Sequence, residues 1–196
     1  MGRQSRDQQR GYTLHIYSRT SNYKKIYHLG GDWVKKIFEN VLVRALEKFN
    51  FELMAYGILD NHFHLIIRTN CDGDYISTIM QFIKSVFAKK FNQETGQTGP
   101  VWNERYGMVI VEKQENPPDY FLRLIWYIYF NPVRAGKVKD PRDYVFSSIN
   151  HYLRVYIHPI KITFSEYFTS LSDSFHGCIE EFLKYEEYYR KRIFYF

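Results

Sequence analysis

The chain has 196 residues, 45% of them hydrophobic, which is enough for one domain with a substantial core. Lys and Arg number 27 against 21 for Asp and Glu, and the resulting formal charge of +6 favours polyanionic partners. The two cysteines, Cys71 and Cys178, lack the spacing of a disulfide framework or a thiolate zinc site. Neither a secretion signal nor an apolar run of about 20 residues is visible, so we expect a cytoplasmic protein without a membrane partner.

The chain opens with a strand pattern followed by a helix pattern. Residues 12–19 alternate between apolar and polar, which predicts a β-strand with Leu14 and Ile16 on its apolar side. The next segment carries apolar residues at helical spacing as far as residue 49, and Asp32 is expected to cap this helix.

A strand hairpin and a second helix are predicted next. Strands at 51–59 and 62–68 flank Asp60 and Asn61, which favour a tight turn between antiparallel strands. Residues 75–91 then return to helical spacing, which predicts a second helix.

A fourth strand and a third helix complete the predicted core. The strand covers residues 106–112, and Asp119 is expected to cap a helix that ends near Asn131, because Pro132 disfavours the α conformation in the residue before it. The order β, α, β, β, α, β, α indicates an α+β fold with a ferredoxin-like core, an antiparallel sheet with helices on one face.

The domain organisation is predicted to be simple. Neither an internal repeat nor a linker rich in Pro, Gly or Ser divides the chain. We therefore assign residues 1–196 to a single domain, with its core at about 11–152 and a C-terminal helical extension at about 153–196.

Two histidines spaced i and i+2 form the first candidate site. On a strand, His62 and His64 point to one face while Phe63 points to the other. Imidazole is a common ligand of first-row metals, and Asp60 or an amide oxygen could add an oxygen ligand. Taken alone, so short a motif is more often a pair of surface or core-edge histidines than a chelate.

A tyrosine and an asparagine one helical turn apart form the second candidate site. Tyr127 and Asn131 share one face of the predicted helix, whereas Tyr129 points elsewhere. A phenol is a weak nucleophile at neutral pH because its usual pKa is near 10, so attack on a phosphate needs a metal and nearby cations. Taken alone, a tyrosine packed against the sheet is the simpler explanation.

Together these segments resemble the REP-associated tyrosine transposases, relatives of the small insertion-sequence transposases within the single-tyrosine branch of the HUH nucleases. The resemblance runs from about residue 11 to about residue 152. It is carried by residues 12–19, by Ala55-Tyr56-Gly57-Ile58-Leu59-Asp60-Asn61-His62-Phe63-His64-Leu65, by Val101-Trp102-Asn103-Glu104-Arg105-Tyr106, by Tyr127-Ile128-Tyr129-Phe130-Asn131-Pro132-Val133-Arg134-Ala135-Gly136 and by Ser147-Ser148.

The resemblance implies a specific enzyme. His62 and His64 would bind Mg²⁺ or Mn²⁺ with Asn131 as a third ligand, and Tyr127 would attack the scissile phosphate of single-stranded DNA. The expected products are a 5′-phosphotyrosine and a free 3′-hydroxyl, and another 3′-hydroxyl could then reseal the strand without ATP. The implied partner is single-stranded DNA with hairpin or palindromic repeats. The protein would be nucleoid-associated and would act either alone or as a homodimer.

One departure from the family pattern concerns the nucleophile. Tyr129 stands where relatives commonly carry histidine, which leaves a second phenol two residues from Tyr127. A helix places the two side chains about 200° apart around its axis, so we expect Tyr129 to be a structural residue or a base-stacking contact.

Substrate contacts are expected from cations in the N-terminal tail, on the second helix and beside the candidate site. Each of them could equally be ordinary solvated charge, because any accessible cation can contact phosphate. These residues are Arg3, Arg6, Arg10, Lys84, Lys89, Lys90, Arg105 and Arg134.

Two other functions compete with the nuclease hypothesis. A ferredoxin-like sheet rich in aromatic residues could bind DNA or RNA without cutting it, although nothing like the RNP signature is present. A small metal hydrolase could use the histidine pair and a metal-bound water. Such hydrolysis should survive the loss of Tyr127, whereas the nuclease hypothesis requires that residue.

Overall fold

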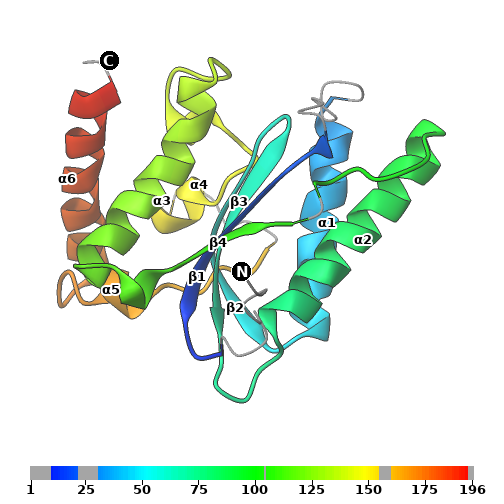
Figure 1. Ribbon diagram of the computed structural model, residues 1–196. Coiled ribbons are helices and arrows are strands. Elements are labelled where there is room, and N and C mark those ends of the chain that lie inside the picture. The colour runs from blue at the N-terminus through cyan, green and yellow to red at the C-terminus, as the bar shows by residue number, and fades with distance from the viewer. Residues whose placement is uncertain (1–9, 22–30, 104, 155–159, 194–196) are drawn as a thin grey trace.

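A four-stranded antiparallel sheet forms the centre of the protein within residues 10–21, 31–103, 105–154 and 160–193, which the computed structural model describes (Figure 1). The strands follow the order β2-β3-β1-β4, and each neighbouring pair is antiparallel. This is the order of a split β-α-β arrangement, so the predicted α+β fold is confirmed. The strands are β1 (Thr13–Arg19), β2 (Phe51–Ile58), β3 (His62–Thr69) and β4 (Gly107–Ile110).

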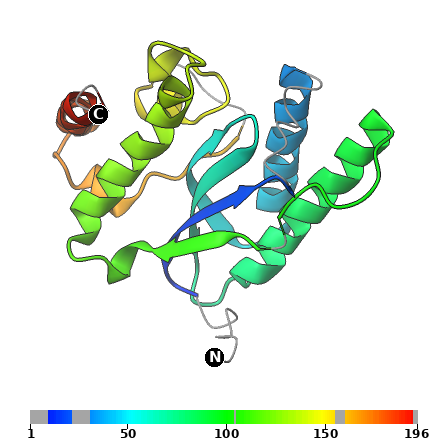
Figure 2. The ribbon, with the colours of Figure 1, turned by 45° about the horizontal axis from the view of Figure 1, so that its top comes forward.

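The two helices between the strands lie on one face of the sheet, as predicted, but later helices also cover the other face, as the two views in Figures 1 and 2 show. The helices α1 (Asp32–Lys48) and α2 (Ile76–Thr95) lie side by side on one face, while α3 (Pro117–Arg134) and α6 (Phe175–Ile193) lie on the other. None of the helices in the described segments combines the length and apolar character needed to cross a bilayer. The shorter elements are η3 (Val111–Lys113), η4 (Pro141–Asp143), α4 (Ile149–Tyr152) and α5 (Glu166–Thr169).

Side chains alternate between the two faces of the sheet along each strand, so one face carries the core and the other carries the histidines. Leu14 and Ile16 are fully buried, as the sequence pattern predicts for the apolar side of β1. Phe63 of β3 packs against Phe38 of α1, with ring centroids 4.7 Å apart, and against Trp102 at 5.2 Å. The neighbours of Phe63 in the chain, both histidines, therefore point away from this core.

Two helix caps differ from the sequence prediction. Asp32 is the first residue of α1 instead of its cap, and Gly31 takes the N-cap position with φ 70°. The cap of α3 is Asn116, whose side chain accepts a hydrogen bond from the Asp119 backbone N–H at 3.4 Å. Asn116 is suited to this role because Pro117 follows it and proline is favoured in the first helical turn.

The helix α3 continues through Pro132, so its predicted end near Asn131 is wrong. The residue before a proline only prefers an extended conformation, and favourable packing and capping outweigh that preference here. Beyond the helix, Gly136 has φ 65°, its N–H donates to the carbonyl of Val133, and the N–H of Lys137 donates to that of Pro132, both at 2.9 Å. This Schellman motif satisfies carbonyls that the helix end would leave unpaired.

Aromatic packing joins α3 to α6. The Trp126 indole stacks on the Phe182 ring with centroids 4.7 Å apart and donates a hydrogen bond to the Phe182 carbonyl at 2.9 Å. Both side chains are fully buried. The position of α6 is therefore tied to the residue that directly precedes Tyr127.

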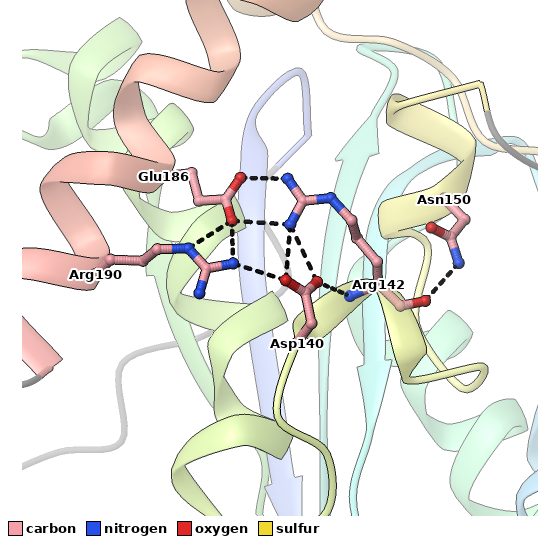
Figure 3. A network of polar contacts seen from close by, with 5 residues as sticks. All are labelled: Asp140, Arg142, Asn150, Glu186 and Arg190. Atoms are coloured by element: carbon pink, nitrogen blue, oxygen red, sulfur yellow. Dashed lines mark hydrogen bonds and ion pairs between the residues drawn. The ribbon is translucent and has the colours of Figure 1, made fainter.

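A charged network fixes the same helix to η4 (Figure 3). Arg142 and Arg190 both donate to the carboxylate of Glu186, at 2.9 Å from Arg142 Nη1 and 2.8 Å from Arg190 Nε. Both arginines also donate to Asp140, and Asn150 donates to the Arg142 carbonyl. Glu186 is only 5% exposed, so two guanidinium groups must compensate the loss of its hydration.

Replacing Glu186 by Gln should therefore lower the free energy of unfolding by about 2 kcal/mol, because it removes the charge that both guanidinium groups share. Urea denaturation would measure this change. Exposed Glu187 provides the matched control, since the Glu187→Gln substitution should change stability by no more than about 0.5 kcal/mol. Equal unfolding midpoints for the two variants would contradict the structural role of the network.

Candidate active site

One row of residues crosses all four strands beneath α3. The strand register pairs Gly57 with His64, His64 with Tyr17, and Tyr17 with Gly107. Directly opposite residues in antiparallel strands share a face, so an imidazole and a phenol lie side by side between two glycines. The ring centroids of Tyr17 and His64 are 6.0 Å apart.

The glycine at one end of this row allows α3 to lie close to the sheet. A Cβ atom at Gly57 would lie 2.9 Å from Cγ2 of Ile128, which is closer than real Cβ contacts. Tyr127 precedes Ile128, and its ring meets His64 with centroids 5.6 Å apart at an angle of 81°. The predicted nucleophile and the predicted metal ligand therefore come together within one subunit.

These side chains line a cleft of about 1020 Å³ between the sheet and the outer helices. Its walls combine aromatic rings with arginines, from β1, β3, α3 and α6. The lining residues are His15, Tyr17, Arg19, His62, His64, Val109, Tyr120, Arg123, Leu124, Tyr127, Arg134, Tyr188 and Tyr189.

Asn131 lies beside the histidine pair. Its side-chain nitrogen donates to the backbone carbonyl of Tyr127 at 2.8 Å, and its side chain lies close enough to His62 to oppose the lowering of that residue's pKa. Because the amide nitrogen is engaged with the helix, the amide oxygen is the atom that a cation beside His62 could use. The ring centroids of His62 and His64 are 5.2 Å apart.

Burial keeps the histidines of the cleft neutral. It lowers the pKa of His62 to about 4, helped by the charge of Arg19 and opposed by Asn131 and Asp60. The pKa of His64 is held well below its usual value, first by burial and then by His15, His62 and Arg19. At neutral pH both imidazoles are therefore uncharged, which is the state that binds metals.

The residues present fit a divalent cation that takes part of its shell from the substrate. The Nδ1 atom of His62 pairs with Asn61 Oδ1 at 2.8 Å, which leaves Nε2 for any other partner. Among the described residues, no three His, Cys, Asp or Glu side chains are arranged to hold a metal. Two imidazoles and the Asn131 oxygen would leave positions for water or phosphate, as Mg²⁺ sites in phosphoryl transfer commonly do.

Asp60, considered as an oxygen ligand, is engaged elsewhere. It is 7% exposed and lies 3.4 Å from Lys35 Nζ, and it also forms an ion pair with Lys137. Burial alone would raise its pKa, but the hydrogen bond from Lys137 and the charge of Lys35 lower the pKa overall. Asp60 therefore joins α1 and the end of α3 to the β2–β3 turn, and it does not line the cleft.

The neighbouring phenol, Tyr129, has a structural position. Its side chain is fully buried and its hydroxyl lies 2.9 Å from Ser148 Oγ, which also accepts the backbone N–H of Tyr56. Burial raises the pKa of Tyr129 well above its usual value. Of the two functions expected for Tyr129, the structural one agrees with this position, because a fully buried ring cannot stack on a base.

Comparison with known proteins identifies the family. The model of the family described as "Transposase IS200 like" matches residues 8–118, more than half of the chain. The chain belongs to this transposase family. The matched segment contains the histidine pair and ends in the first turn of α3, before Tyr127.

Relatives extend the likeness beyond this segment. A REP-associated tyrosine transposase of Escherichia coli K12 is 25% identical over 156 residues, covering 71% of this chain and 89% of that protein. A Haemophilus influenzae protein named for the same group is 23% identical over 157 residues, covering 76% and 83%. The solved structure of a REP-associated tyrosine transposase bound to a REP hairpin matches with a TM-score of 0.61 and 25% identity, covering 84% of this chain and 93% of that one. This chain is accordingly an enzyme of DNA transposition.

Of the cations predicted to contact DNA, Arg134 lines the cleft of this transposase, with its guanidinium carbon 5.9 Å from the Tyr127 ring centroid. Lys84, Lys89 and Lys90 lie on α2, across the sheet from that cleft. Lys84 donates to the carbonyl of Asn103 at 2.7 Å.

The remaining predicted cations lie away from the cleft or outside the described residues. Lys90 pairs with Glu94 at 2.6 Å. The Arg10 guanidinium packs over the Tyr75 ring at 3.7 Å, and Arg105 is exposed ahead of β4. Arg3 and Arg6 lie outside the residues that the structure describes. The DNA contacts of all eight predicted cations stay predictions.

Sequence reasoning missed several residues that line the cleft. His15 and Tyr17 project from β1 toward the histidine pair, and Arg19 stands opposite His62 in the strand register. The alternation of β1 gave a signal, since His15 and Tyr17 fall on the face opposite Leu14. The missing information was the pairing of β1 with β3.

The packing of Tyr17 over Gly107 predicts how the Gly107→Ala substitution changes stability. A Cβ atom at Gly107 would lie 2.1 Å from Cζ of Tyr17, so the Gly107→Ala substitution must displace this ring. Because the ring is 40% exposed and can turn toward solvent, the cost should be about 1 kcal/mol or less. In a Tyr17→Ser background the same change should be neutral or stabilise by about 0.5 kcal/mol, because alanine restricts the unfolded chain. Urea denaturation of all four proteins measures the coupling, and simple additivity would contradict the contact.

Proposed function

We propose that this transposase is a metal-dependent single-stranded DNA endonuclease and strand transferase with Tyr127 as its nucleophile. The observation that carries the proposal is the 5.6 Å contact between the Tyr127 and His64 rings in a cleft formed by one subunit. Tyr127 is half-buried and lines the cleft, whereas fully buried Tyr129 faces Ser148. The position of Tyr127 favours it over its neighbour as the attacking phenol.

The chemical step is an in-line transfer of a phosphoryl group. The Tyr127 hydroxyl gives up its proton to solvent as its oxygen bonds to the scissile phosphorus. The bond from phosphorus to the 3′-oxygen breaks, and the departing 3′-oxygen takes up a proton to become a hydroxyl. The phosphate stays on the 5′ side as a phosphotyrosine. Because one phosphate ester replaces another, a second 3′-hydroxyl can displace Tyr127 and rejoin the strand without an external energy source.

His62, His64 and Asn131 would hold a divalent cation, Mg²⁺ or Mn²⁺, at this site. Bound there, the cation would polarise a phosphate oxygen and offset the negative charge that develops during transfer. The neutral state of the histidines and the position of the Asn131 side chain support this assignment. Asp60 is left out of the proposed ligand set because two lysines surround it.

The composition of the cleft supports single-stranded DNA as its substrate. Arg19, Arg123 and Arg134 place positive charge along the lining, where phosphates could bind. Tyr17 is 40% exposed and Tyr188 is 40% exposed, so both offer ring surface to unstacked bases. The structural relative is bound to a REP hairpin, and we extend that substrate class to this chain.

The Tyr127→Phe variant should lose the covalent DNA adduct, at least about 1000-fold, while retaining DNA binding, because it removes one hydroxyl and little volume. The measurement incubates the variant with a single-stranded hairpin substrate from the genomic neighbourhood of its gene and Mg²⁺ or Mn²⁺, followed by denaturing electrophoresis.

The matched control is the Tyr129→Phe variant, which should still form the adduct and lose about 1 kcal/mol of stability with its bond to Ser148. Cleavage that persists in Tyr127→Phe without an adduct would favour a metal-bound water as nucleophile. A wild-type protein that binds the hairpin without cutting it would favour the non-cleaving binding domain.

The proposed metal role predicts a joint loss of cleavage and metal binding. EDTA should abolish cleavage, and the His64→Ala variant should weaken Mn²⁺ binding and cleavage together, because an imidazole ligand is lost. Calorimetric titration with Mn²⁺ and a gel assay measure the two effects. Exposed His176, substituted by Ala, serves as the control and should leave both unchanged. Full cleavage in EDTA would refute a catalytic metal.

A further inference from the structure

A third histidine, His15, lies beside the histidine pair. Its side chain is 6% exposed, and its Nε2 atom lies 3.0 Å from Nδ1 of His64. The two rings are nearly parallel, with centroids 5.2 Å apart and planes 23° apart.

The hydrogen bond between the two imidazoles has a definite direction. One nitrogen must carry the proton and the other must accept it. If Nε2 of His64 is to offer a lone pair to a cation, its proton must sit on Nδ1, and His15 Nε2 is then the acceptor. The opposite arrangement would place the proton on Nε2 of His64 and block it as a ligand.

We infer that His15 is a positioning residue that accepts the Nδ1 proton of His64 and thereby directs His64 Nε2 toward the metal; this rests on the proposed function. Metal-binding histidines commonly donate their second N–H to a carboxylate, a carbonyl or water, and the loss of such a partner weakens binding. Here the acceptor is the imidazole of His15 on the neighbouring strand β1. The residue directly opposite His64 on that strand is Tyr17, two residues after His15.

His15 is placed to support the metal ligand and not to be a ligand itself. Its Nε2 atom is engaged with Nδ1 of His64 at hydrogen-bonding distance, so it faces the ring nitrogen of His64 that is not proposed to bind the cation. No three His, Cys, Asp or Glu side chains in the described part of the chain are arranged as a metal site. A cation at this site would therefore use the imidazoles of His62 and His64, with His15 behind His64.

The test compares a substitution that removes the acceptor with one that restores it. The His15→Phe variant keeps a planar ring but accepts no proton, so Mn²⁺ affinity should fall about 10- to 100-fold. The His15→Gln variant can place an amide oxygen near the lost nitrogen and should recover most of the affinity. Calorimetry measures the affinity, and ¹⁵N NMR of the metal-free proteins reports which nitrogen of His64 carries the proton.

The expected result is protonation at Nδ1 of His64 in the wild type and in His15→Gln, with that preference lost in His15→Phe. Unchanged affinity and protonation in His15→Phe would overturn the inference, as would pulsed EPR showing three nitrogens bound to Mn²⁺. A wild-type protein that binds Mn²⁺ but forms no DNA adduct would contradict the proposed function and leave the role of His15 intact.

Discussion

The close approach of α3 to the sheet is the constraint on which the candidate site depends. Gly57 provides no Cβ, and Ile128 occupies the space that one would fill. Gly57 also stands directly opposite His64 in the register, so the same residue sets the distance between the histidine strand and the tyrosine helix. A larger side chain at Gly57 would lift α3 and separate Tyr127 from His64. The separation of the proposed nucleophile and the proposed metal ligands is thus fixed by packing in the core.

A second contact prevents the tyrosine helix α3 from shifting along the histidine strand β3. Asp60 sits in the turn that leads to His62, and it binds Lys35 of α1 and Lys137 just beyond α3. The Schellman motif that ends α3 delivers Lys137 to this position, since Gly136 turns the chain there. Removing Asp60 would leave the nearly buried ammonium group of Lys35 without this carboxylate. Asp60 therefore acts on the site through position, although its place beside two histidines suggested a ligand.

Much of this arrangement could be read from periodicity, because strand alternation and helical spacing are local properties. Alternation put His62 and His64 on one face, and helical spacing set Tyr127 apart from Tyr129. Other features depend on contacts between distant residues and leave no local trace. The pairing of Tyr17 with His64 requires the strand register, and the passage of α3 through Pro132 requires its packing and its capped end. The roles of the site residues stay predictions that the geometry supports.

Two parts of the chain form the cleft, one inside and one beyond the segment that the family model matches. The segment matched by the family model supplies the sheet and its histidines, whereas Tyr127 lies on α3 beyond that segment. Trp126, next to Tyr127, stacks on Phe182 of α6, and Glu186 ties the same helix to η4. The helices beyond residue 118 therefore do more than cover the sheet. They hold the phenol above the histidines and bring Arg123 and Arg134 into the lining of the cleft.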